Sequence, residues 1–503
     1  MDEPQRAHAQ PHMAEEVDVL IVGAGLSGIG AAYHLQTLCP DRSYCILESR
    51  GAIGGTWDLF RYPGVRSDSD MYTLGYSFAP WTGEEAIADG ASILRYIREV
   101  AARHGITDRI RYHHKVVRAD WHSDSARWTV RVERDGGTAV LFRCKWLHMA
   151  SGYYDYEQAH LPDFPGRDRF TGEFVVPQFW PGSLNVEGKR VVVIGSGATA
   201  VTLVPELAKT AAHVTMLQRS PSYIVSLPAR DPIARALRKL LRARRAFRLV
   251  RWKNVLLQMI LYRLARSRPG MTKRQMIKAV RKHVGPQVDV ETHFTPRYKP
   301  WDQRVCLVPD GDLFKAIRSG SVAVVTGRIA CLEENGIRME DGSKLEAEVV
   351  VAATGLTIKL LSGVTFTLDG QPQDLSRSLI YKGMMFSGVP NLSYSFGYTN
   401  ASWTLKADLI SAYLCRLLNR MKDDGCAVAL AVRQPGIKEV PFVDFTSSYV
   451  QRALPFLPSQ GARRPWRLYQ NYALDLAALK WGRLDDGVLR FRRCAAEPQH
   501  LPG

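Results

Sequence analysis

Two glycine-rich turns constrain the fold of this chain more than any other feature of its 503 residues. The first turn is Gly23-Ala24-Gly25-Leu26-Ser27-Gly28, and the second is Gly195-Ser196-Gly197-Ala198-Thr199-Ala200. Each follows an apolar run typical of a buried parallel strand (17–22 and 190–194) and precedes a segment of helical pattern (29–37 and 201–210). The glycines permit a tight turn and bring a pyrophosphate close to the helix N-terminus. The pattern predicts an α/β fold with two Rossmann-type dinucleotide-binding domains.

The residues at the end of the following strand carry opposite charges in the two units. Glu48 comes 20 residues after Gly28, and a carboxylate accepts hydrogen bonds from ribose hydroxyls. Arg219 comes 19 residues after Ala200, with Ser220 beside it, and an arginine attracts a 2′-phosphate. The first unit therefore predicts a site for the ADP half of a flavin or of NAD, and the second predicts a site for NADP.

The length of the chain predicts two or three domains, because single cores rarely grow beyond about 250–300 residues. Hydrophobic residues make up 46% and charged residues 23% of the chain, which is ordinary for a soluble protein. The eight cysteines lack the spacing of a metal clip or a redox pair, so no metal site is predicted and a cytoplasmic location is favoured. Residues 1–16 are polar, lack the apolar core of a signal peptide and are predicted to form a disordered tail. No stretch approaches the roughly 18 apolar residues of a membrane span.

The net charge of +18 is concentrated in one segment. Between Arg230 and Lys282 there are eighteen Lys and Arg residues and a single acidic residue, Asp231. Apolar residues are interleaved with the charges, so the segment is amphipathic and predicts two or three helices. The favoured interpretation is a helical cap whose apolar face packs on the body of the protein. Peripheral contact with an anionic membrane is the second, because basic amphipathic helices bind such surfaces. Nucleic acid is disfavoured as a partner, since no recognition motif accompanies the charge.

Two strand-like segments that end in small residues, 146–153 and 349–356, indicate where the chain crosses between the domains. They predict the first part of the first dinucleotide-binding domain at 17–160 and the second, NADP-type domain at 161–345, with a helical insertion at 229–290. The second part of the first domain and the C-terminal segment are predicted at 346–503. The segment at 349–356 is expected to return the chain to the first domain.

Several short segments match the motifs of one enzyme family. Gly54-Gly55-Thr56-Trp57 precedes Arg61-Tyr62-Pro63-Gly64, and the two small-residue strand ends are Ala150-Ser151-Gly152 and Ala353-Thr354-Gly355. Phe170-x-Gly172-x-x-x-Val176-x-x-x-Trp180-Pro181 forms a longer pattern. From about residue 17 to about residue 487 the chain resembles the class B flavoprotein monooxygenases, which comprise Baeyer–Villiger and flavin-containing monooxygenases. The Trp-Pro ending resembles the Baeyer–Villiger form.

One position departs from the pattern of that family. Val176 stands where the family has a histidine, on a linker that helps to couple nucleotide binding to the domain arrangement. Because valine neither donates nor accepts a hydrogen bond, we expect slower or less coupled NADPH oxidation without loss of flavin. Compensation by Gln178 is the alternative.

The resemblance also implies a catalytic pair. Arg304, in Trp301-Asp302-Gln303-Arg304, takes the place of an arginine that reaches over the flavin, and Asp68 takes the place of its carboxylate partner. Gln303 stands at the family's lysine position, which leaves Arg219 to set the preference for NADPH. The cofactor-binding residues expected from the turns and motifs together are Gly23, Gly25, Gly28, Glu48, Gly55, Thr56, Trp57, Asp68, Tyr72, Gly195, Gly197, Ala198, Thr199, Ala200, Arg219, Ser220, Gln303 and Asn400.

The reaction implied by the resemblance uses FAD, NADPH and O₂ to oxidise a small organic substrate. One oxygen atom is inserted by way of a C4a-peroxyflavin, most favourably in a Baeyer–Villiger oxidation of a ketone to an ester or lactone. N- or S-oxygenation of an amine or sulfide is the alternative. A flavin-dependent disulfide reductase is disfavoured, because Cys39 and Cys45 do not provide its redox-active cysteine pair.

Overall fold

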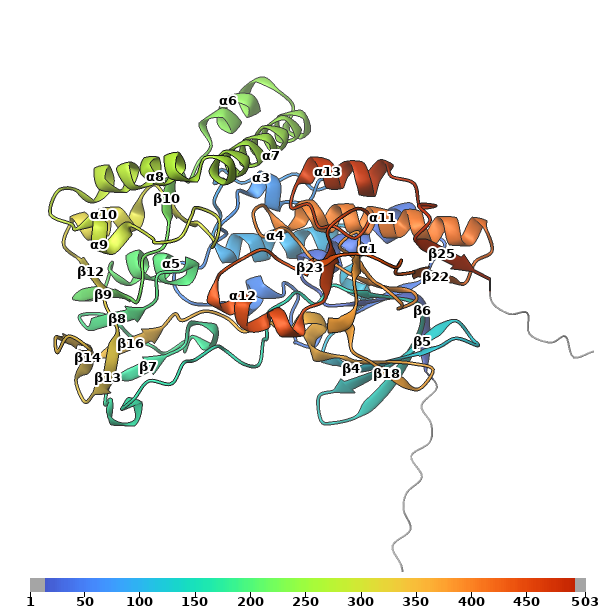
Figure 1. Ribbon diagram of the computed structural model, residues 1–503, viewed down its shortest axis with the longest axis horizontal. Coiled ribbons are helices and arrows are strands. Elements are labelled where there is room, and N and C mark those ends of the chain that lie inside the picture. Colours follow the sequence, from blue (N-terminus) through green and yellow to red (C-terminus); the bar gives the residue numbers. More distant parts are fainter. Residues whose placement is uncertain (1–13, 494–503) are drawn as a thin grey trace, which may run out of the picture.

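The computed structural model describes residues 14–493 and shows two α/β domains side by side (Figure 1). In that view the first domain lies on the right and the second on the left, and the long helices of the insertion run along the upper edge. The predicted fold class, with two Rossmann-type units, is confirmed.

The first domain is built on a nine-stranded sheet in the order β18-β17-β4-β5-β6-β1-β2-β3, with β21 paired to β6. β1 runs parallel to both β2 and β6, because its apolar residues from Val19 onward are buried on both faces of the sheet. The strands are β1 (Glu15–Val22), β2 (Tyr44–Leu47), β3 (Ile110–Arg111), β4 (His114–His122), β5 (Arg127–Arg134), β6 (Ala139–Met149), β17 (Thr365–Leu368), β18 (Gln371–Gln373) and β21 (Leu392–Tyr394).

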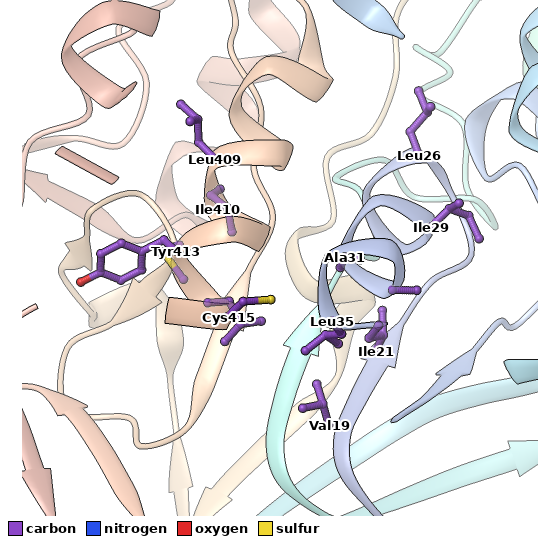
Figure 2. Close-up of a cluster of buried hydrophobic side chains, with 14 of the residues drawn as sticks. Val19, Ile21, Leu26, Ile29, Ala31, Leu35, Leu409, Ile410, Tyr413 and Cys415 are labelled. Carbon is purple, nitrogen blue, oxygen red and sulfur yellow. The ribbon is translucent and has the colours of Figure 1, made fainter. Parts of the chain in front are cut away.

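Two helices from opposite ends of the chain pack together in this domain (Figure 2). Leu26, Ile29 and Leu35 of α1 (Leu26–Leu38) belong to the same buried cluster as Leu409 and Ile410 of α11 (Trp403–Asp423). Burying one such aliphatic side chain contributes roughly 1.5–3 kcal/mol. The packing fixes the first glycine turn, which immediately precedes α1, against the C-terminal third of the chain.

The second domain has a five-stranded parallel sheet in the order β12-β9-β8-β16-β7. Its strands are β7 (Glu173–Val175), β8 (Arg190–Ile194), β9 (His213–Gln218), β12 (Val322–Thr326) and β16 (Val349–Ala352). β16 lies between β8 and β7. We expected the segment 349–356 to return the chain to the first domain, with the boundary at residue 346. This is wrong for the strand β16, which belongs to the second sheet. The chain crosses to the first domain after Ala352. The sequence of an all-apolar strand does not show to which sheet the strand belongs, because a central strand of either sheet is buried on both faces.

The basic insertion forms three helices, α6 (Pro232–Leu240), α7 (Ala243–Ser267) and α8 (Pro269–Val284), followed by α9 (Val290–Phe294). α7 packs on α3 (Met71–Leu74) of the first domain, whereas α8 packs on α10 (Asp312–Arg318) of the second. The predicted helical cap is present, and it spans both domains (Figure 1).

Further helices and small sheets complete the described chain. The helices are α2 (Thr56–Leu59), α4 (Gly90–Arg103), α5 (Ala198–Leu207), α12 (Ser448–Ala453) and α13 (Tyr472–Leu476). The short strands are β10 (Ile224–Leu227), β11 (Cys306–Pro309), β13 (Ile329–Glu333), β14 (Gly336–Met339), β15 (Lys344–Glu346), β19 (Ile380–Tyr381), β20 (Met385–Phe386), β22 (Val428–Ala431), β23 (Glu439–Pro441), β24 (Ser459–Gly461) and β25 (Leu489–Arg492).

The N-terminal expectation needs one correction. β1 begins at Glu15, which pairs in register with Phe142, so the last two residues of the tail expected at 1–16 belong to a strand. Residues 1–13 lie outside the described part of the chain. Among residues 14–493 no helix is both long and apolar enough to cross a membrane.

A buried histidine lies at the centre of the first sheet. His148 of β6 has no exposed surface, its Nδ1 lies 2.8 Å from Ser393 Oγ, and its Nε2 has no hydrogen-bond partner within residues 14–493. Burial lowers the pKa of His148 to about 4. Folding therefore keeps this imidazole neutral at pH values where the unfolded chain protonates it.

Acidification is expected to destabilise the protein through His148. The unfolded chain binds this proton below pH 6.5 and the folded chain only near pH 4, so the free energy of unfolding falls as the pH falls between these values. The expected loss is about 3 kcal/mol. Urea unfolding of wild type and His148→Gln at pH 4 and pH 7 measures it. A wild-type midpoint that shifts between the two pH values no more than that of the variant would contradict the assignment.

Candidate active site

A large pocket opens between the two domains, and both glycine turns contribute to its wall. It receives the N-termini of α1 and α5, the linker 150–157 and the loop 65–69. Ten of the residues expected from the sequence line this pocket: Gly23, Gly25, Glu48, Gly55, Thr56, Trp57, Asp68, Ala198, Thr199 and Arg304. The two nucleotide sites predicted separately thus face one shared cavity.

The first turn fits the pyrophosphate of a dinucleotide. Gly23 has φ 106°, and a Cβ there would lie 2.7 Å from the carbonyl oxygen of Ala150. Gly25 caps α1 without a side-chain hydrogen bond, so the first backbone N–H groups of the helix point into the pocket. A Cβ on Gly25 would lie 3.7 Å from Gly55 Cα, in the narrow space between the two turns. These features provide an anion site bounded by backbone atoms.

Glu48 directly follows β2 and lines the same pocket. Its Oε2 accepts a hydrogen bond from the Ala24 N–H at 2.8 Å, and its Oε1 accepts one from the Arg50 N–H at 2.9 Å. Burial raises the pKa of the Glu48 carboxyl, and the two backbone N–H groups oppose the rise. The carboxylate has further lone pairs for ribose hydroxyls. The chemistry of this donor and acceptor set fits the ADP half of FAD.

The second turn repeats this geometry at the edge of the other sheet. Gly195 has φ 138°, and a Cβ there would lie 2.3 Å from the Ala353 carbonyl oxygen. Gly197 caps α5 without a side-chain hydrogen bond, and nothing in residues 14–493 lies within 4 Å of a Cβ built on it. The open helix N-terminus fits a second pyrophosphate.

Arg219 and Ser220 lie just beyond the end of β9, and both are exposed. β8 and β9 are parallel with Ile194 opposite Leu217, so Arg219 and the second turn share one edge of the sheet. Within the described residues the Arg219 guanidinium makes no hydrogen bond or ion pair, whereas Ser220 O accepts a hydrogen bond from Ser196 Oγ at 3.1 Å. The arginine charge is thus available at the position where a 2′-phosphate would follow the turn.

Arg304 and Asp68 meet across the pocket. Arg304 Nη1 lies 3.6 Å from Asp68 Oδ2, and their side chains are 35% and 26% exposed. Burial raises the pKa of Asp68, while the positive charges of Arg304 and Arg66 oppose the rise. Arg304 itself carries a permanent charge. The pair places an oriented cation at the meeting point of the two domains.

Aromatic side chains surround this cation. Tyr153 follows the linker Ala150-Ser151-Gly152, its hydroxyl lies 2.6 Å from that of Tyr154, and its ring stacks on Trp403 with centroids 5.1 Å apart. Trp403 Nε1 donates a hydrogen bond to Ser27 Oγ at 2.7 Å. Together with Tyr449 of α12, these rings line a smaller apolar cavity beside Arg304. Its lining beside the Arg304 guanidinium is mostly apolar and aromatic.

Sequence reasoning missed two groups in the pocket wall. Arg66 Nη1 donates to Asp312 Oδ2 at 2.5 Å, while its Nη2 and Ser151 Oγ are buried and have no hydrogen-bond partner in the described chain. Such orphaned donors at the wall point to a polar ligand. Arg66 stands two residues before Asp68, which was a usable signal. Tyr449 of α12, which lines the smaller cavity, gave no such signal, because it lies far along the chain from the motifs.

Other expected cofactor-binding residues lie outside the pocket wall. The Tyr72 ring centroid lies 6.1 Å from that of Phe247 and under the Arg238 guanidinium, so the insertion covers it and its role in cofactor binding stays a prediction. Asn400 Nδ2 donates to the Gln470 carbonyl at 2.9 Å, and Gln303 is half-buried next to Arg304.

Gly28 and Ala200 are closely packed and do not line the pocket. A Cβ on Gly28 would lie 1.9 Å from the carbonyl oxygen of Gly23, and Ala200 is fully buried in α5. Both positions let the helix pack closely on its strand.

Val176 and Gln178 lie next to the linker between the domains. Val176 is half-buried and precedes the short helical turn Pro177–Phe179. Gln178 is 5% exposed, and its Nε2 donates to the carbonyl oxygen of Asp155 at 2.8 Å. Gln178 therefore makes the polar connection between this segment and the linker.

Comparison with known families and relatives gives a consistent result. A family model described as flavin-binding monooxygenase-like matches residues 85–362, and one for an NAD(P)-binding Rossmann-like domain matches residues 21–80. The FAD-containing monooxygenase EthA of Mycobacterium tuberculosis is 52% identical over 484 residues, which cover 96% of this chain and 99% of that protein. The probable FAD-binding monooxygenase AlmA of Acinetobacter sp. is 44% identical over 96% of this chain and 97% of its own length.

Solved structures share the fold at lower identity. An oxidised steroid monooxygenase bound to NADP superimposes with a TM-score of 0.76 at 22% identity, covering 95% of this chain and 100% of the other. An open form of cyclohexanone monooxygenase gives a TM-score of 0.74 at 18% identity over the same shares.

Proposed function

The chain belongs to the flavin-binding monooxygenase-like family, and on that premise we propose that it is a Baeyer–Villiger enzyme that inserts one oxygen atom of O₂ into a ketone. It is an FAD- and NADPH-dependent monooxygenase, an oxidoreductase. The substrate is a small uncharged carbonyl compound, and the product is an ester or lactone.

The observation that carries the proposal is the ion pair of Arg304 and Asp68 in the pocket shared by both glycine turns. Addition to a ketone carbonyl places negative charge on the carbonyl oxygen. A fixed guanidinium stabilises that charge where water is excluded. Oxygen transfer to an amine or sulfide develops no such anion on the substrate, so the cation favours the carbonyl reaction.

Each part of the wall has a distinct task in this proposal. When bound, FAD and NADPH supply the redox chemistry that activates O₂. The α1 and α5 N-termini hold their pyrophosphates. Asp68 orients Arg304 through a charge-assisted contact, and Arg304 faces the polarised carbonyl oxygen. Tyr153 and Trp403 close the wall and exclude water.

Product identification tests the proposal. Purified protein with bound FAD is incubated with NADPH, ¹⁸O₂ and equal amounts of a cyclic ketone, a linear ketone, a sulfide and a tertiary amine. We expect ¹⁸O-labelled lactone and ester, with NADPH oxidation stimulated by the ketones. If labelled sulfoxide or N-oxide dominates, the enzyme is a heteroatom oxygenase and the assigned role of Arg304 is wrong.

Restoring the family histidine by Val176→His is expected to raise the fraction of NADPH electrons that reach product. Gln178→Leu is expected to lower it, because it removes the hydrogen bond to the linker at Asp155. Both should retain FAD, since neither residue lines the pocket. Hydrogen peroxide released per NADPH oxidised measures the coupling. Unchanged peroxide release in both variants would show that this segment does not control coupling.

A further inference from the structure

The longest helix of the insertion has apolar side chains on two opposite faces. On the inner face, Phe247 and Val250 of α7 are buried against Tyr72. The outer face exposes large apolar side chains: Leu249 is 52% exposed, Trp252 45%, Leu256 51% and Ile260 62%. Single exposed apolar residues are normal on a protein surface, but a continuous row of them marks an interaction site.

The spacing of these residues makes them one row. Leu249, Trp252, Leu256 and Ile260 are separated by three, four and four positions, which places them along one line of an α-helix. Arg245 precedes Leu249 by four positions and Arg263 follows Ile260 by three, so an exposed arginine stands at each end of the row. Neither guanidinium makes an ion pair or hydrogen bond within the described residues. The outer face of α7 thus carries an apolar centre and basic ends.

The apolar surface extends to neighbouring helices. The Trp252 ring meets the ring of Tyr472, in α13, with centroids 5.7 Å apart, and Leu474 of α13 is 37% exposed. On α6, Leu240 is 78% exposed. α6, α7 and α13 lie along the same upper edge of the molecule (Figure 1). Each of these three helices therefore carries exposed apolar side chains.

We propose that the outer face of α7 docks the enzyme on an anionic membrane surface. The apolar row would enter the boundary between head groups and acyl chains, where tryptophan is favoured. Arg245 and Arg263 are long enough to reach the anionic head groups from the ends of the row. The docking goes beyond the proposed oxygenation and does not depend on it.

Charge argues for lipid over a second copy of the chain. In a twofold symmetric dimer the same patch meets itself, so each basic end would face a basic surface. The segment 230–282 has eighteen basic residues and one acidic residue, which makes that contact repulsive. A membrane surface with anionic head groups avoids this repulsion and also covers the apolar row.

The inner face of the same helix contacts the active-site loop. Asn254 Nδ2 donates to Asp70 Oδ1 at 2.8 Å, and Gln258 Nε2 donates to Asp70 Oδ2 at 3.1 Å. Asp70 stands two residues from Asp68. In a docked enzyme the helix that faces the membrane would therefore also contact the loop beside the pocket. This arrangement would bring the pocket close to apolar substrates that are concentrated in the lipid.

Vesicle co-sedimentation tests the docking with the FAD-loaded, full-length protein. Vesicles of phosphatidylcholine alone are compared with equimolar phosphatidylcholine and phosphatidylglycerol. We expect at least about tenfold tighter binding to the anionic vesicles, weakened by salt. Leu256→Ser/Ile260→Ser and Arg245→Gln/Arg263→Gln are each expected to weaken binding about tenfold. The emission of Trp252 is obtained as the difference between the fluorescence spectra of wild type and Trp252→Phe. It should shift to shorter wavelengths when anionic vesicles are added.

The matched control is Leu38→Ser/Leu141→Ser, which removes two apolar residues that are each 42% exposed outside the insertion. It should bind vesicles as wild type does. Retained FAD absorbance shows that each variant is folded. Wild-type protein that stays in the supernatant, or an α7 double-serine variant that sediments like wild type, would overturn the proposal. So would a concentration-dependent dimer, measured by sedimentation velocity, that the double-serine variant abolishes.

Discussion

Replacing Arg304 by alanine is expected to lower the rate of ester or lactone formation by about 10²- to 10³-fold while FAD stays bound. The guanidinium lies 3.6 Å from Asp68 at the meeting point of the two domains, and it is the permanent cation that faces the apolar cavity. Its removal leaves negative charge on a substrate carbonyl unstabilised. FAD content is measured by absorbance, NADPH oxidation by the loss of absorbance at 340 nm, and product by mass spectrometry.

Three further variants separate a catalytic cation from a structural one. Arg304→Lys keeps the charge but loses the planar fork, so it should recover part of the lost rate. Asp68→Asn keeps the shape but no longer orients the guanidinium by charge, and a smaller loss is expected. Arg281→Ala breaks the exposed ion pair with Glu291 and should match wild type. Product formation by Arg304→Ala within tenfold of wild type would show that the arginine does not act on the substrate.

The sequence predicted the two glycine turns correctly because their function depends on local geometry. A strand, a tight turn and an uncapped helix N-terminus are determined within about 15 residues, and the described structure shows both turns in that form. Asp68 and Arg304 are 236 positions apart, and no periodic pattern brings them together. Only the resemblance to a family pointed to that pair.

Tertiary packing, and not local pattern, decides the surroundings of two predicted segments. Tyr72 lies close in sequence to Asp68, but α7 covers it and its ring contacts Phe247, so its role in cofactor binding stays a prediction. The strand 349–352 is apolar throughout, which fits a central strand of either sheet, and pairing with β8 assigns it to the second.

The helical insertion is a further case in which tertiary packing decides what the sequence pattern leaves open. Its amphipathic pattern predicted helices and a buried face, and both are present. With apolar residues on two sides of α7, the sequence alone does not determine which side is buried. The contact with α3 makes that choice and leaves the row from Leu249 to Ile260 exposed.

Replacing Arg219 by alanine is expected to raise the KM for NADPH by about 10- to 100-fold and to leave the KM for NADH nearly unchanged. A hydrogen bond to a charged group contributes about 1.5–3 kcal/mol, and about 1.4 kcal/mol corresponds to a factor of ten. The Arg219 guanidinium is exposed beside the second turn and makes no ion pair within residues 14–493, so its charge is not already neutralised. Steady-state kinetics with both nucleotides at saturating ketone measure the effect.

The arginine at the opposite edge of the same sheet provides the control. Arg190 begins β8 and bonds to Glu346, so Arg190→Ala removes an equal charge far from the turn and should leave both KM values unchanged. Arg219→Lys keeps the charge without the fork and should lie between wild type and Arg219→Ala. Equal increases in KM for NADPH and NADH would instead indicate that Arg219 contacts a part of the molecule that both nucleotides share. Because the uncharged Gln303 stands at the family's lysine position, an increase in KM confined to NADPH would identify Arg219 as the main 2′-phosphate contact.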